Sequence, residues 1–381
     1  MINVFQPSLG QEELQALAEV FSDNWPGHGE RTAEFEKEFA AHIGVPGESV
    51  LFLNNATAGL FLAMELLELK PGDEVVLPSV SFVSAANAVA ATGAVPVFCD
   101  VDPHTLNPTV ADVESALTPR TRAVCVLHYG GYPGEVTGIA DLCRSRGIPL
   151  LEDAACAVAS RVEGRSCGTF GDLATWSFDS MKTLVTGDGG MLYVRDEKLM
   201  ATARRLAYYG TGQRTGFTSA RVSDRWWELH VEGFGRRLIG NDMTAAIGRV
   251  QLRRLPDFVS AREKVAARYT ESLADVEGVR LPPPAPPGHA LSHYFYWVQL
   301  DSRMRDQVAA DLRDRGIYTT FRYPPLHRVP AYGSRKTLPA TDRAAEETLL
   351  LPLHQGLSEE DVEQVVREFR AAVARRGGGG T

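Results

Sequence analysis

Short apolar segments alternate with amphipathic segments between residues 50 and 195 of this chain. The short segments are rich in Val, Leu and Phe, as buried strands are, while the segments between them carry apolar residues at helical spacing. This alternation predicts an α/β fold, with helices on both faces of an open parallel sheet and ligands at the carboxyl ends of its strands. The expected strands cover residues 51–53, 74–78, 95–101, 122–128, 149–153, 174–178 and 189–194, and the expected helices cover 58–69, 85–93 and 135–147.

The pattern changes after residue 196, where longer helices are expected around 197–209 and 242–275. The proline-rich stretch 282–287 cannot form a helix or a central strand, so it marks a connection into the last part of the chain. That part is expected to hold a strand at 293–300 and helices at 303–316 and 358–376.

The length of 381 residues and the ordinary apolar content favour two domains. We expect a large domain at 1–250 with an N-terminal helical segment, a small α+β domain at 251–381 and a flexible tail at 375–381. The formal net charge of −9, with no basic block, makes nucleic acid and anionic membranes unexpected partners. No secretory signal and no apolar run long enough to cross a membrane is present in the sequence.

The five cysteines form no CxxC pair and no His–Cys ligand spacing. Neither a disulfide framework nor a zinc site is therefore predicted, and reduced thiols in a cytoplasmic protein are expected.

Lys182 is the first candidate for chemistry, because it stands in SFDSMKTLVTGDGG between a serine-aromatic pair and a glycine-rich turn. A lysine there is either a solvated residue at a strand end or an amine held in a pocket to react with a carbonyl. The local sequence does not choose between the two.

Two other stretches lie at expected strand ends. NNATAGL at 54–60 precedes a helix, so free backbone N–H groups and the Thr57 hydroxyl would bind a phosphate, unless these residues only cap the helix. LEDAA at 151–155 ends an apolar strand with two acids. Asp153 would pair with a protonated ring nitrogen or would lie at the surface rim.

Phe82 stands at a third junction between strand and helix, where it would cover a planar ring or pack in the core. Lys182 follows Asp153 by 29 residues, and Ser177 can add a donor for a phosphate. An acid, a later lysine and an upstream phosphate cradle match the needs of pyridoxal phosphate. That cofactor requires an amine for its aldehyde, a carboxylate for its pyridine nitrogen, and N–H and O–H donors for its phosphate.

The order of the motifs resembles one family from end to end. The matching segments are GERTAEFEKEFAAHIGV, NNATAGL, SVSFVSAANAV, FCDVDPHTLN, EDAA, WSFDSMKTLVTGDGG, AAIGRVQLRRL, YPPLHRVPAY and LPLH. With these, the chain resembles the DegT/DnrJ/StrS-type sugar aminotransferases. The resemblance implies the aspartate-aminotransferase fold, called fold type I among pyridoxal phosphate enzymes, with a mixed, mostly parallel seven-stranded sheet between helices and a small α+β C-terminal domain.

The resemblance also implies roles for single residues. Lys182 would bond to the cofactor aldehyde and act as general acid and base, and Asp153 would contact the pyridinium. The other expected cofactor contacts are Thr57, Ala58 and Ser177 at the phosphate, Phe82 on the ring, and Cys156. The expected substrate contacts are His327, Tyr323 and Arg236.

Two departures from the family pattern leave contacts open. Cys156 stands where the family usually has Gln or His, which puts the contact to the phenolic oxygen of the cofactor in doubt. In GFGRRLIGNDM, Arg237 aligns with the asparagine that reaches the phosphate of the neighbouring subunit, and Asn241 is its rival. Either contact implies a homodimer with active sites at the interface.

The implied reaction is transamination, with L-glutamate as the expected donor and pyridoxamine phosphate as the intermediate form of the cofactor. The expected acceptor is a nucleotide-linked keto-deoxysugar or a keto-cyclitol, in amino-sugar or antibiotic biosynthesis. Lys182 argues against the dehydratase branch of the family, which has histidine there. The alternatives are another fold type I enzyme, such as a lyase or a desulfurase that uses Cys156, and a non-catalytic cofactor-binding regulator.

The segment 211–237 contains several arginines and a tryptophan pair, which would hold a nucleotide diphosphate or form a dimer interface. These residues are Arg214, Arg221, Arg225, Trp226, Trp227, Arg236 and Arg237.

Overall fold

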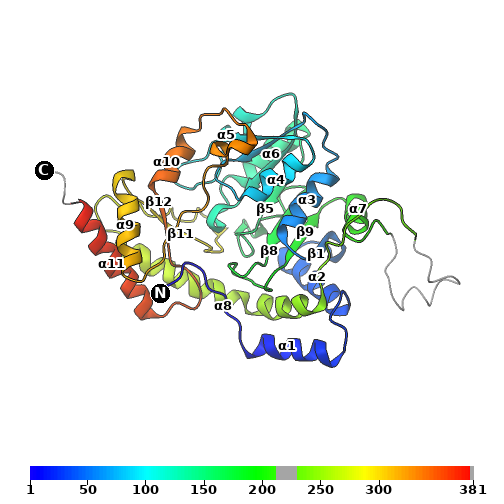
Figure 1. Cartoon of the computed structure of the whole chain (residues 1–381), viewed down its shortest axis with the longest axis horizontal. Coiled ribbons are helices and arrows are strands. Elements are labelled where there is room, and N and C mark those ends of the chain that lie inside the picture. The colour runs from blue at the N-terminus through cyan, green and yellow to red at the C-terminus, as the bar shows by residue number, and fades with distance from the viewer. Residues whose placement is uncertain (212–229, 378–381) are drawn as a thin grey trace.

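The computed structural model describes residues 1–211 and 230–377 (Figure 1). Its main sheet has seven strands in the order β1-β9-β8-β5-β4-β2-β3, and within this sheet only β9 runs opposite to the others. The predicted seven-stranded, mostly parallel sheet is thus confirmed. The strands are β1 (Val50–Leu53), β2 (Glu74–Pro78), β3 (Val95–Cys99), β4 (Thr121–Leu127), β5 (Leu150–Asp153), β8 (Leu173–Ser177) and β9 (Gly190–Val194).

Helices cover both faces of this sheet, because its strands are apolar on both sides. On β1, Val50 and Phe52 join one buried cluster, while Leu51 and Leu53 join the other. The first cluster includes side chains of α2 (Glu30–Ile43), α5 (Val110–Ala116), α6 (Val136–Arg146) and α8 (Asp242–Leu273). The second includes α3 (Ala56–Leu66), α4 (Val83–Ala91) and α7 (Glu197–Ala207).

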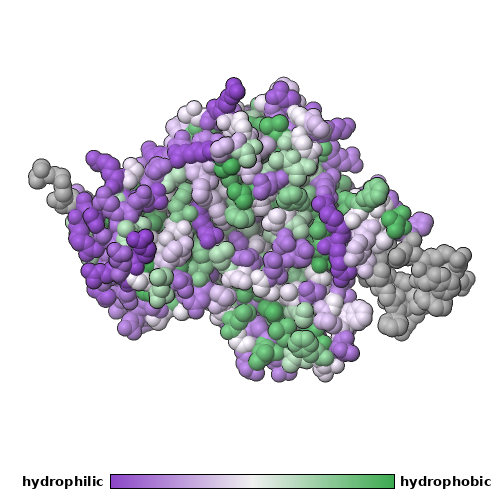
Figure 2. Space-filling model, viewed as in Figure 1, coloured by the Kyte–Doolittle hydropathy of each residue, from purple (hydrophilic) through white to green (hydrophobic). Residues whose placement is uncertain are grey.

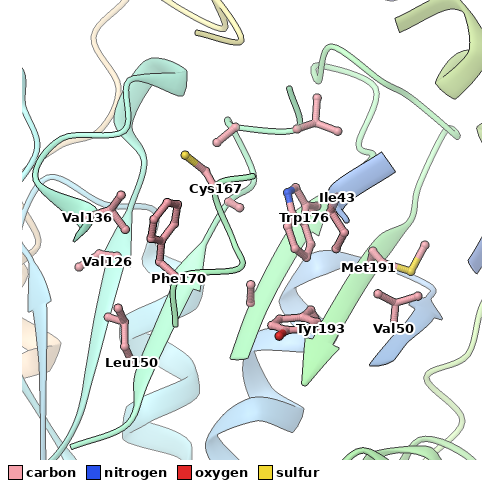
Figure 3. Close-up of a cluster of buried hydrophobic side chains, with 14 of the residues drawn as sticks. Ile43, Val50, Val126, Val136, Leu150, Cys167, Phe170, Trp176, Met191 and Tyr193 are labelled. Carbon is pink, nitrogen blue, oxygen red and sulfur yellow. The ribbon is translucent and has the colours of Figure 1, made fainter. Parts of the chain in front are cut away.

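Part of the first cluster is shown in Figure 3, where Trp176 and Met191 from neighbouring strands lie close to Ile43 and Val50. Each fully buried side chain of this size contributes roughly 1.5–3 kcal/mol by leaving water. The packing fixes the central strands and therefore the loops that follow them.

A second, smaller unit surrounds the antiparallel pair β11 (Tyr296–Gln299) and β12 (Thr348–Leu351). Its core includes side chains of the second half of α8, and Figure 1 shows α9 and α11 on the side away from the main sheet. Its helices are α9 (Ser302–Asp314), α10 (Pro339–Glu347) and α11 (Glu359–Gly377).

The predicted domain division at residue 250 stays a prediction, and α8 runs through that position without a break. The N-terminus contacts the smaller unit, because Ile2 pairs with Ile317. Residues 375–377, expected in a flexible tail, form the last part of α11, where Arg375 and Arg376 pair with Asp311. The rest of that tail, 378–381, lies outside the described residues.

The remaining described elements are short or lie at the N-terminus. The strand expected at 293–300 begins only at Tyr296, because the N–H groups of Tyr294 and Phe295 both donate to the carbonyl of Gly130 instead of to a strand partner. The remaining elements are α1 (Gln11–Ser22), β6 (Arg161–Val162), β7 (Arg165–Ser166), β10 (His289–Ala290), η1 (Gly47–Ser49), η2 (Tyr129–Gly131), η4 (Leu326–Arg328) and η5 (Pro330–Tyr332).

Within the described ranges, no helix is both long and apolar enough to span a bilayer. Five of the residues singled out in the segment 211–237 lie outside the described residues: Arg214, Arg221, Arg225, Trp226 and Trp227.

Candidate active site

The candidate site lies at the carboxyl ends of the central strands. Asp153 is the last residue of β5, and Ser177 is the last residue of the neighbouring β8. Lys182 follows in the loop between β8 and β9, where its backbone N–H donates to the carbonyl of Asp179 at 2.8 Å. This is the edge of an open α/β sheet at which ligands bind.

Lys182 lies among buried groups. Its Nζ is 4.8 Å from the centre of the Tyr294 ring. Burial lowers the pKa of Lys182, but Tyr294, Cys156 and Asp153 raise it, and the net result is a pKa above the usual range. Burial also keeps the Tyr294 and Cys156 protons in place by raising the pKa of each, so Asp153 is the anion that favours the ammonium form.

Asp153 is buried, with 3% of its surface exposed. One carboxylate oxygen accepts a hydrogen bond from the Ala155 N–H at 3.1 Å. In residues 1–211 and 230–377 no hydrogen bond reaches the other oxygen, so the carboxylate retains an acceptor for a ring N–H. Burial raises the pKa of Asp153. The hydrogen bond from the Ala155 N–H and the charges of Lys182 and His128 lower this pKa, but the net result is an increase.

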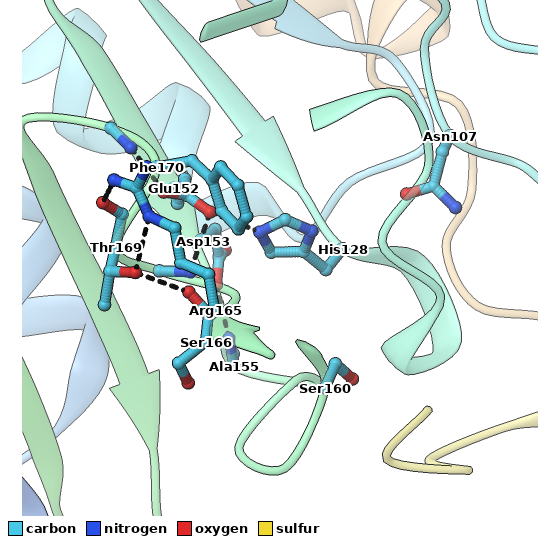
Figure 4. Close-up of polar contacts among 12 residues, drawn as sticks. Asn107, His128, Glu152, Asp153, Ala155, Ser160, Arg165, Ser166, Thr169 and Phe170 are labelled. Atoms are coloured by element: carbon cyan, nitrogen blue, oxygen red, sulfur yellow. Dashed lines mark hydrogen bonds and ion pairs between the residues drawn. The ribbon is translucent and has the colours of Figure 1, made fainter. Parts of the chain in front are cut away.

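The second acid of this strand end has different partners, as Figure 4 shows. Glu152 accepts hydrogen bonds from the N–H groups of Gly168 at 2.7 Å and Gly171 at 2.5 Å. The Nε2 of His128 lies 2.8 Å from its carboxylate. Glu152 therefore holds the loop after β5 together, and Asp153 is the acid that remains open toward a ligand.

The N-terminus of α3 supplies the candidate phosphate cradle. Asn55 caps this helix, because its side-chain oxygen accepts the Ala58 N–H at 2.8 Å. The expected phosphate donor at Ala58 is therefore already bonded within the chain, and the N–H groups of Ala56 and Thr57 are the ones that a helix start leaves without carbonyl partners. The exposed side chain of Thr57 adds a hydroxyl.

Two further groups lie around this cradle. The Ser177 hydroxyl accepts a long hydrogen bond of 3.4 Å from the Asp179 N–H, so its own proton is available to a ligand. Phe82 is the N-cap residue of α4, and 46% of this residue is exposed. An exposed phenylalanine at a strand end is suited to cover a planar ring.

Tyr323 and Cys156 are buried neighbours of Asp153. The Tyr323 ring lies 5.5 Å from that of Phe82, and its side chain hydrogen-bonds to Cys156. Burial raises the pKa of Cys156 to about 11. The thiol therefore stays protonated at neutral pH.

Two residues expected at the substrate have partners within the chain. The His327 Nδ1 lies 2.7 Å from the Ser79 hydroxyl, and its Nε2 lies 3.2 Å from Asp342. Arg236 pairs with Glu65 of α3. The substrate roles of His327 and Arg236 stay predictions, and each requires the ligand to compete with these partners.

Arg237 and Asn241 also have roles within the chain. Asn241 caps α8 by accepting the Thr244 N–H at 3.0 Å. The Arg237 guanidinium lies over Tyr208, 5.7 Å from the ring centre. A contact from either residue to a neighbouring subunit stays a prediction.

Tyr294 was not expected at the site from the sequence. HYFYWVQL is typical of a strand, and four aromatic residues in succession give no sign of which one leaves the core. The contact depends on Gly130, whose carbonyl turns the chain just before β11.

Together these groups fit pyridoxal phosphate. The site offers an amine, a buried carboxylate with a free oxygen, a helix N-terminus and an exposed aromatic ring, which are the donors that this cofactor needs. No group of three or more His, Cys, Asp or Glu in the described ranges could hold a metal ion. A fold and site of this kind define a cofactor-dependent transferase.

Comparisons with known proteins agree with this class. The family model of the DegT/DnrJ/EryC1/StrS aminotransferases matches residues 7–370. A protein of Saccharopolyspora spinosa named dTDP-4-dehydro-2,3,6-trideoxy-D-glucose 4-aminotransferase is 61% identical over 373 residues, which cover 98% of this chain and 97% of that protein.

Solved structures are similar over the whole fold. The aminotransferase TlmJ from Streptoalloteichus hindustanus has a TM-score of 0.95 and 59% identity, covering 99% of this chain and all of that one. The PLP-form of a putative sugar aminotransferase, Spr1654 from Streptococcus pneumoniae, has a TM-score of 0.89 at 22% identity, covering 98% of each chain. The second likeness shows the fold alone.

The chain belongs to the DegT/DnrJ/EryC1/StrS aminotransferase family. The predicted family, fold class and transaminase activity are thereby confirmed. Pyridoxal phosphate is the cofactor that membership of this family implies.

Proposed function

We propose that this chain transfers an amino group from L-glutamate to the C4 keto group of a thymidine-diphosphate-linked deoxysugar, with pyridoxal phosphate as cofactor. The observation that carries the proposal is the 61% identity, over 98% of the chain, to a relative named for that acceptor.

The cofactor supplies an aldehyde that bonds to amines and a ring that withdraws electrons from the substrate carbon. Lys182 provides the amine that anchors it and then carries the proton to and from that carbon. Asp153 holds a proton at the ring nitrogen through its free oxygen. The start of α3, with Thr57 and Ser177, binds the phosphate, and Phe82 covers the ring.

The reactivity of Cys156 argues against the desulfurase alternative. A cysteine nucleophile must be deprotonated, and burial raises the pKa of this thiol to about 11. Its hydrogen bond to Tyr323 and its burial favour a packing role beside the cofactor. Incubation with L-cysteine is therefore expected to release no sulfide.

A homodimer is part of the proposal. The helix α1 presents a row of exposed apolar side chains, Leu14, Ala18 and Phe21, and Trp25 follows it in sequence. Figure 2 shows hydrophobic colouring at the lower end of the molecule, where Figure 1 places α1. A patch of this kind is typical of a surface that a partner covers.

The expected cytoplasmic location agrees with five cysteines that are all buried and free.

Two half-reactions test the proposal. Addition of L-glutamate to the yellow holoenzyme should replace its absorption band with that of the pyridoxamine form and produce 2-oxoglutarate. The second half-reaction is then offered four acceptors: the nucleotide-linked 4-keto sugar, its 3-keto isomer, the sugar without nucleotide, and a keto-cyclitol. Mass spectrometry of the product should show turnover of the first at least tenfold faster than of the others, a difference of about 1.4 kcal/mol in the barrier.

Lys182→Ala should remove both the absorption band and the turnover. Lys198→Ala is the matched control, because Lys198 is exposed on α7. Retention of band and turnover in Lys182→Ala would refute the assignment of the amine. Faster turnover of the cyclitol would refute the proposed acceptor but not the chemistry.

A further inference from the structure

Tyr294, the tyrosine beside Lys182, is held in place by ring contacts and by a backbone hydrogen bond. The Tyr294 side chain is 2% exposed and stacks on Phe5, with ring centres 5.7 Å apart and planes 20° apart. Its ring also contacts Phe295 at 4.5 Å. On its backbone, the N–H donates to the Gly130 carbonyl at 3.0 Å.

A buried arginine, Arg262, binds the backbone carbonyl of Tyr294. Arg262 of α8 has no exposed surface, and no carboxylate within the described ranges pairs with it. Its guanidinium donates to the carbonyls of His293 at 3.3 Å, Tyr294 at 3.5 Å and Leu353 at 3.1 Å, and its Nε donates to Gln355. Burial lowers the pKa of Arg262 to about 10.

A buried cation without an anion is costly, so its position requires an explanation. The carbonyls that it binds belong to the turn that presents Tyr294 and to the segment that follows β12. The result is a tyrosine whose backbone is bonded on both sides and whose ring faces the Lys182 amine at 4.8 Å.

We propose that Tyr294, fixed by Arg262, is a positioning residue that holds the free Lys182 amine in the site whenever the amine is not bonded to the cofactor. The phenol oxygen holds the ammonium group by a hydrogen bond, and the face of the aromatic ring adds a smaller attraction. A free lysine side chain has several rotamers, and this contact restricts them near the substrate carbon. The proposal rests on the proposed function for its kinetic part only.

The other titratable groups facing the amine are less suited to this task. Cys156 keeps its proton and is a weak hydrogen-bonding partner, and Tyr323 is engaged with Cys156. Asp153 is reserved for the ring nitrogen in the proposed function. Tyr294 is the neighbour that remains neutral and is still polar.

The first test uses the apoprotein. The rate at which Lys182 reacts with trinitrobenzenesulfonate is measured against pH by mass spectrometry of its peptide. The phenol oxygen of Tyr294 hydrogen-bonds to the amine and favours its ammonium form, so Tyr294→Phe, which removes this oxygen, should move the midpoint of this profile down. Tyr296→Phe is the matched control, because its hydroxyl contacts Thr270 at 3.0 Å and lies in the core of the smaller unit.

The second test is kinetic. Tyr294→Phe should lower kcat about tenfold or more and leave the KM for the acceptor within about twofold, because positioning acts on proton transfer and not on substrate binding. Arg262→Lys keeps a cation but loses the planar fork of donors that reaches three carbonyls and Gln355, so it should move both readouts in the same direction if Tyr294→Phe fails to fold.

An unchanged titration midpoint together with an unchanged kcat in Tyr294→Phe would overturn the proposal. A wild-type enzyme without transaminase activity would instead contradict the proposed function, and the titration of the apoprotein would still decide the role of Tyr294.

Discussion

At the scale of single residues, the two acids that end β5 have separate tasks because consecutive strand residues face opposite ways. Glu152 is bonded to two backbone N–H groups and to His128, whereas Asp153 accepts a single hydrogen bond from the chain. Substitution of each acid by its amide should therefore have a different effect.

Asp153→Asn should lower kcat by about a hundredfold or more and leave the melting temperature nearly unchanged, because an amide cannot hold the proton at the ring nitrogen. Glu152→Gln should lower the melting temperature and leave kcat nearly unchanged, because it removes the negative charge that accepts hydrogen bonds from three donors. Steady-state kinetics and circular dichroism of both variants give the comparison. A strong loss of activity in Glu152→Gln without loss of stability would contradict the assignment.

His354 links stability to pH. Burial lowers its pKa from 6.5 to about 4, with Arg262 adding to the effect. The unfolded chain therefore binds a proton below pH 6.5 that the folded protein binds only near pH 4. The free energy of unfolding should fall over this interval by on the order of 2 kcal/mol from this residue alone.

Urea unfolding at pH 7, 5.5 and 4.5 measures this dependence. His354→Asn keeps an acceptor for the Gly356 N–H, which the His354 Nδ1 accepts at 3.2 Å, and has no titrating group. Its loss of stability on acidification should be smaller than that of the wild type. Equal losses in the two proteins would show that His354 does not contribute.

Some of these residues can be predicted from sequence and others cannot. Lys182, Asp153 and Phe82 stand in motifs at strand ends, and the structure brings all three to the same edge of the sheet. Tyr294 and Arg262 act through contacts between segments distant in sequence, and neither has a local pattern. The capping of α3 by Asn55, which occupies the Ala58 N–H, was foreseen only as an alternative to phosphate binding.

At the scale of elements, the cradle at the start of α3 depends on Gly190 in β9. A Cβ at that position would lie 2.4 Å from the Ala56 nitrogen and 2.6 Å from the Asn55 carbonyl carbon. Both are backbone atoms, so the helix start would have to move. The glycine therefore sets the distance between β9 and the phosphate cradle.

Gly190→Ala should lower the affinity for pyridoxal phosphate at least tenfold and destabilise the fold by about 1–3 kcal/mol through overpacking. Titration of the apoprotein with the cofactor measures the first effect and thermal unfolding the second. Gly47→Ala is the control, because nothing lies within 4 Å of a Cβ there. Wild-type affinity in Gly190→Ala would contradict the role given to this contact.

Element boundaries followed the apolar pattern closely where burial decides them. The helix expected at 242–275 ends at Leu273, and the strand expected at 95–101 ends at Cys99. The two-residue strands β6, β7 and β10 were missed, because so short a segment has no measurable alternation. β6 and β7 pair across a turn, and β10 pairs with β6 although the two are more than a hundred residues apart in the sequence.

At the scale of the whole molecule, the fold class followed from the regular alternation of strands and helices, which hydrophobic burial enforces. Assembly does not follow in this way. Arg237 and Asn241 both have partners within one chain, so neither the sequence nor a single subunit distinguishes a residue that serves its own site from one that serves the neighbouring site.

Mixed dimers can make this distinction. Suppose that Arg237 binds the phosphate of the neighbouring subunit. A dimer of one Lys182→Ala and one Arg237→Ala subunit then contains one intact site, because both substitutions affect the site of the Lys182→Ala subunit. Random pairing of two such inactive proteins should then restore about a quarter of wild-type activity, since half of the dimers are mixed and each of these has one working site of two.

Asn241→Asp is the parallel variant, because an aspartate still caps α8 but cannot donate to a phosphate. Restoration with Arg237→Ala and not with Asn241→Asp identifies the arginine, and the opposite result identifies the asparagine. If neither pairing restores activity, although each single variant is inactive and dimeric, the contact to the phosphate is made within one subunit.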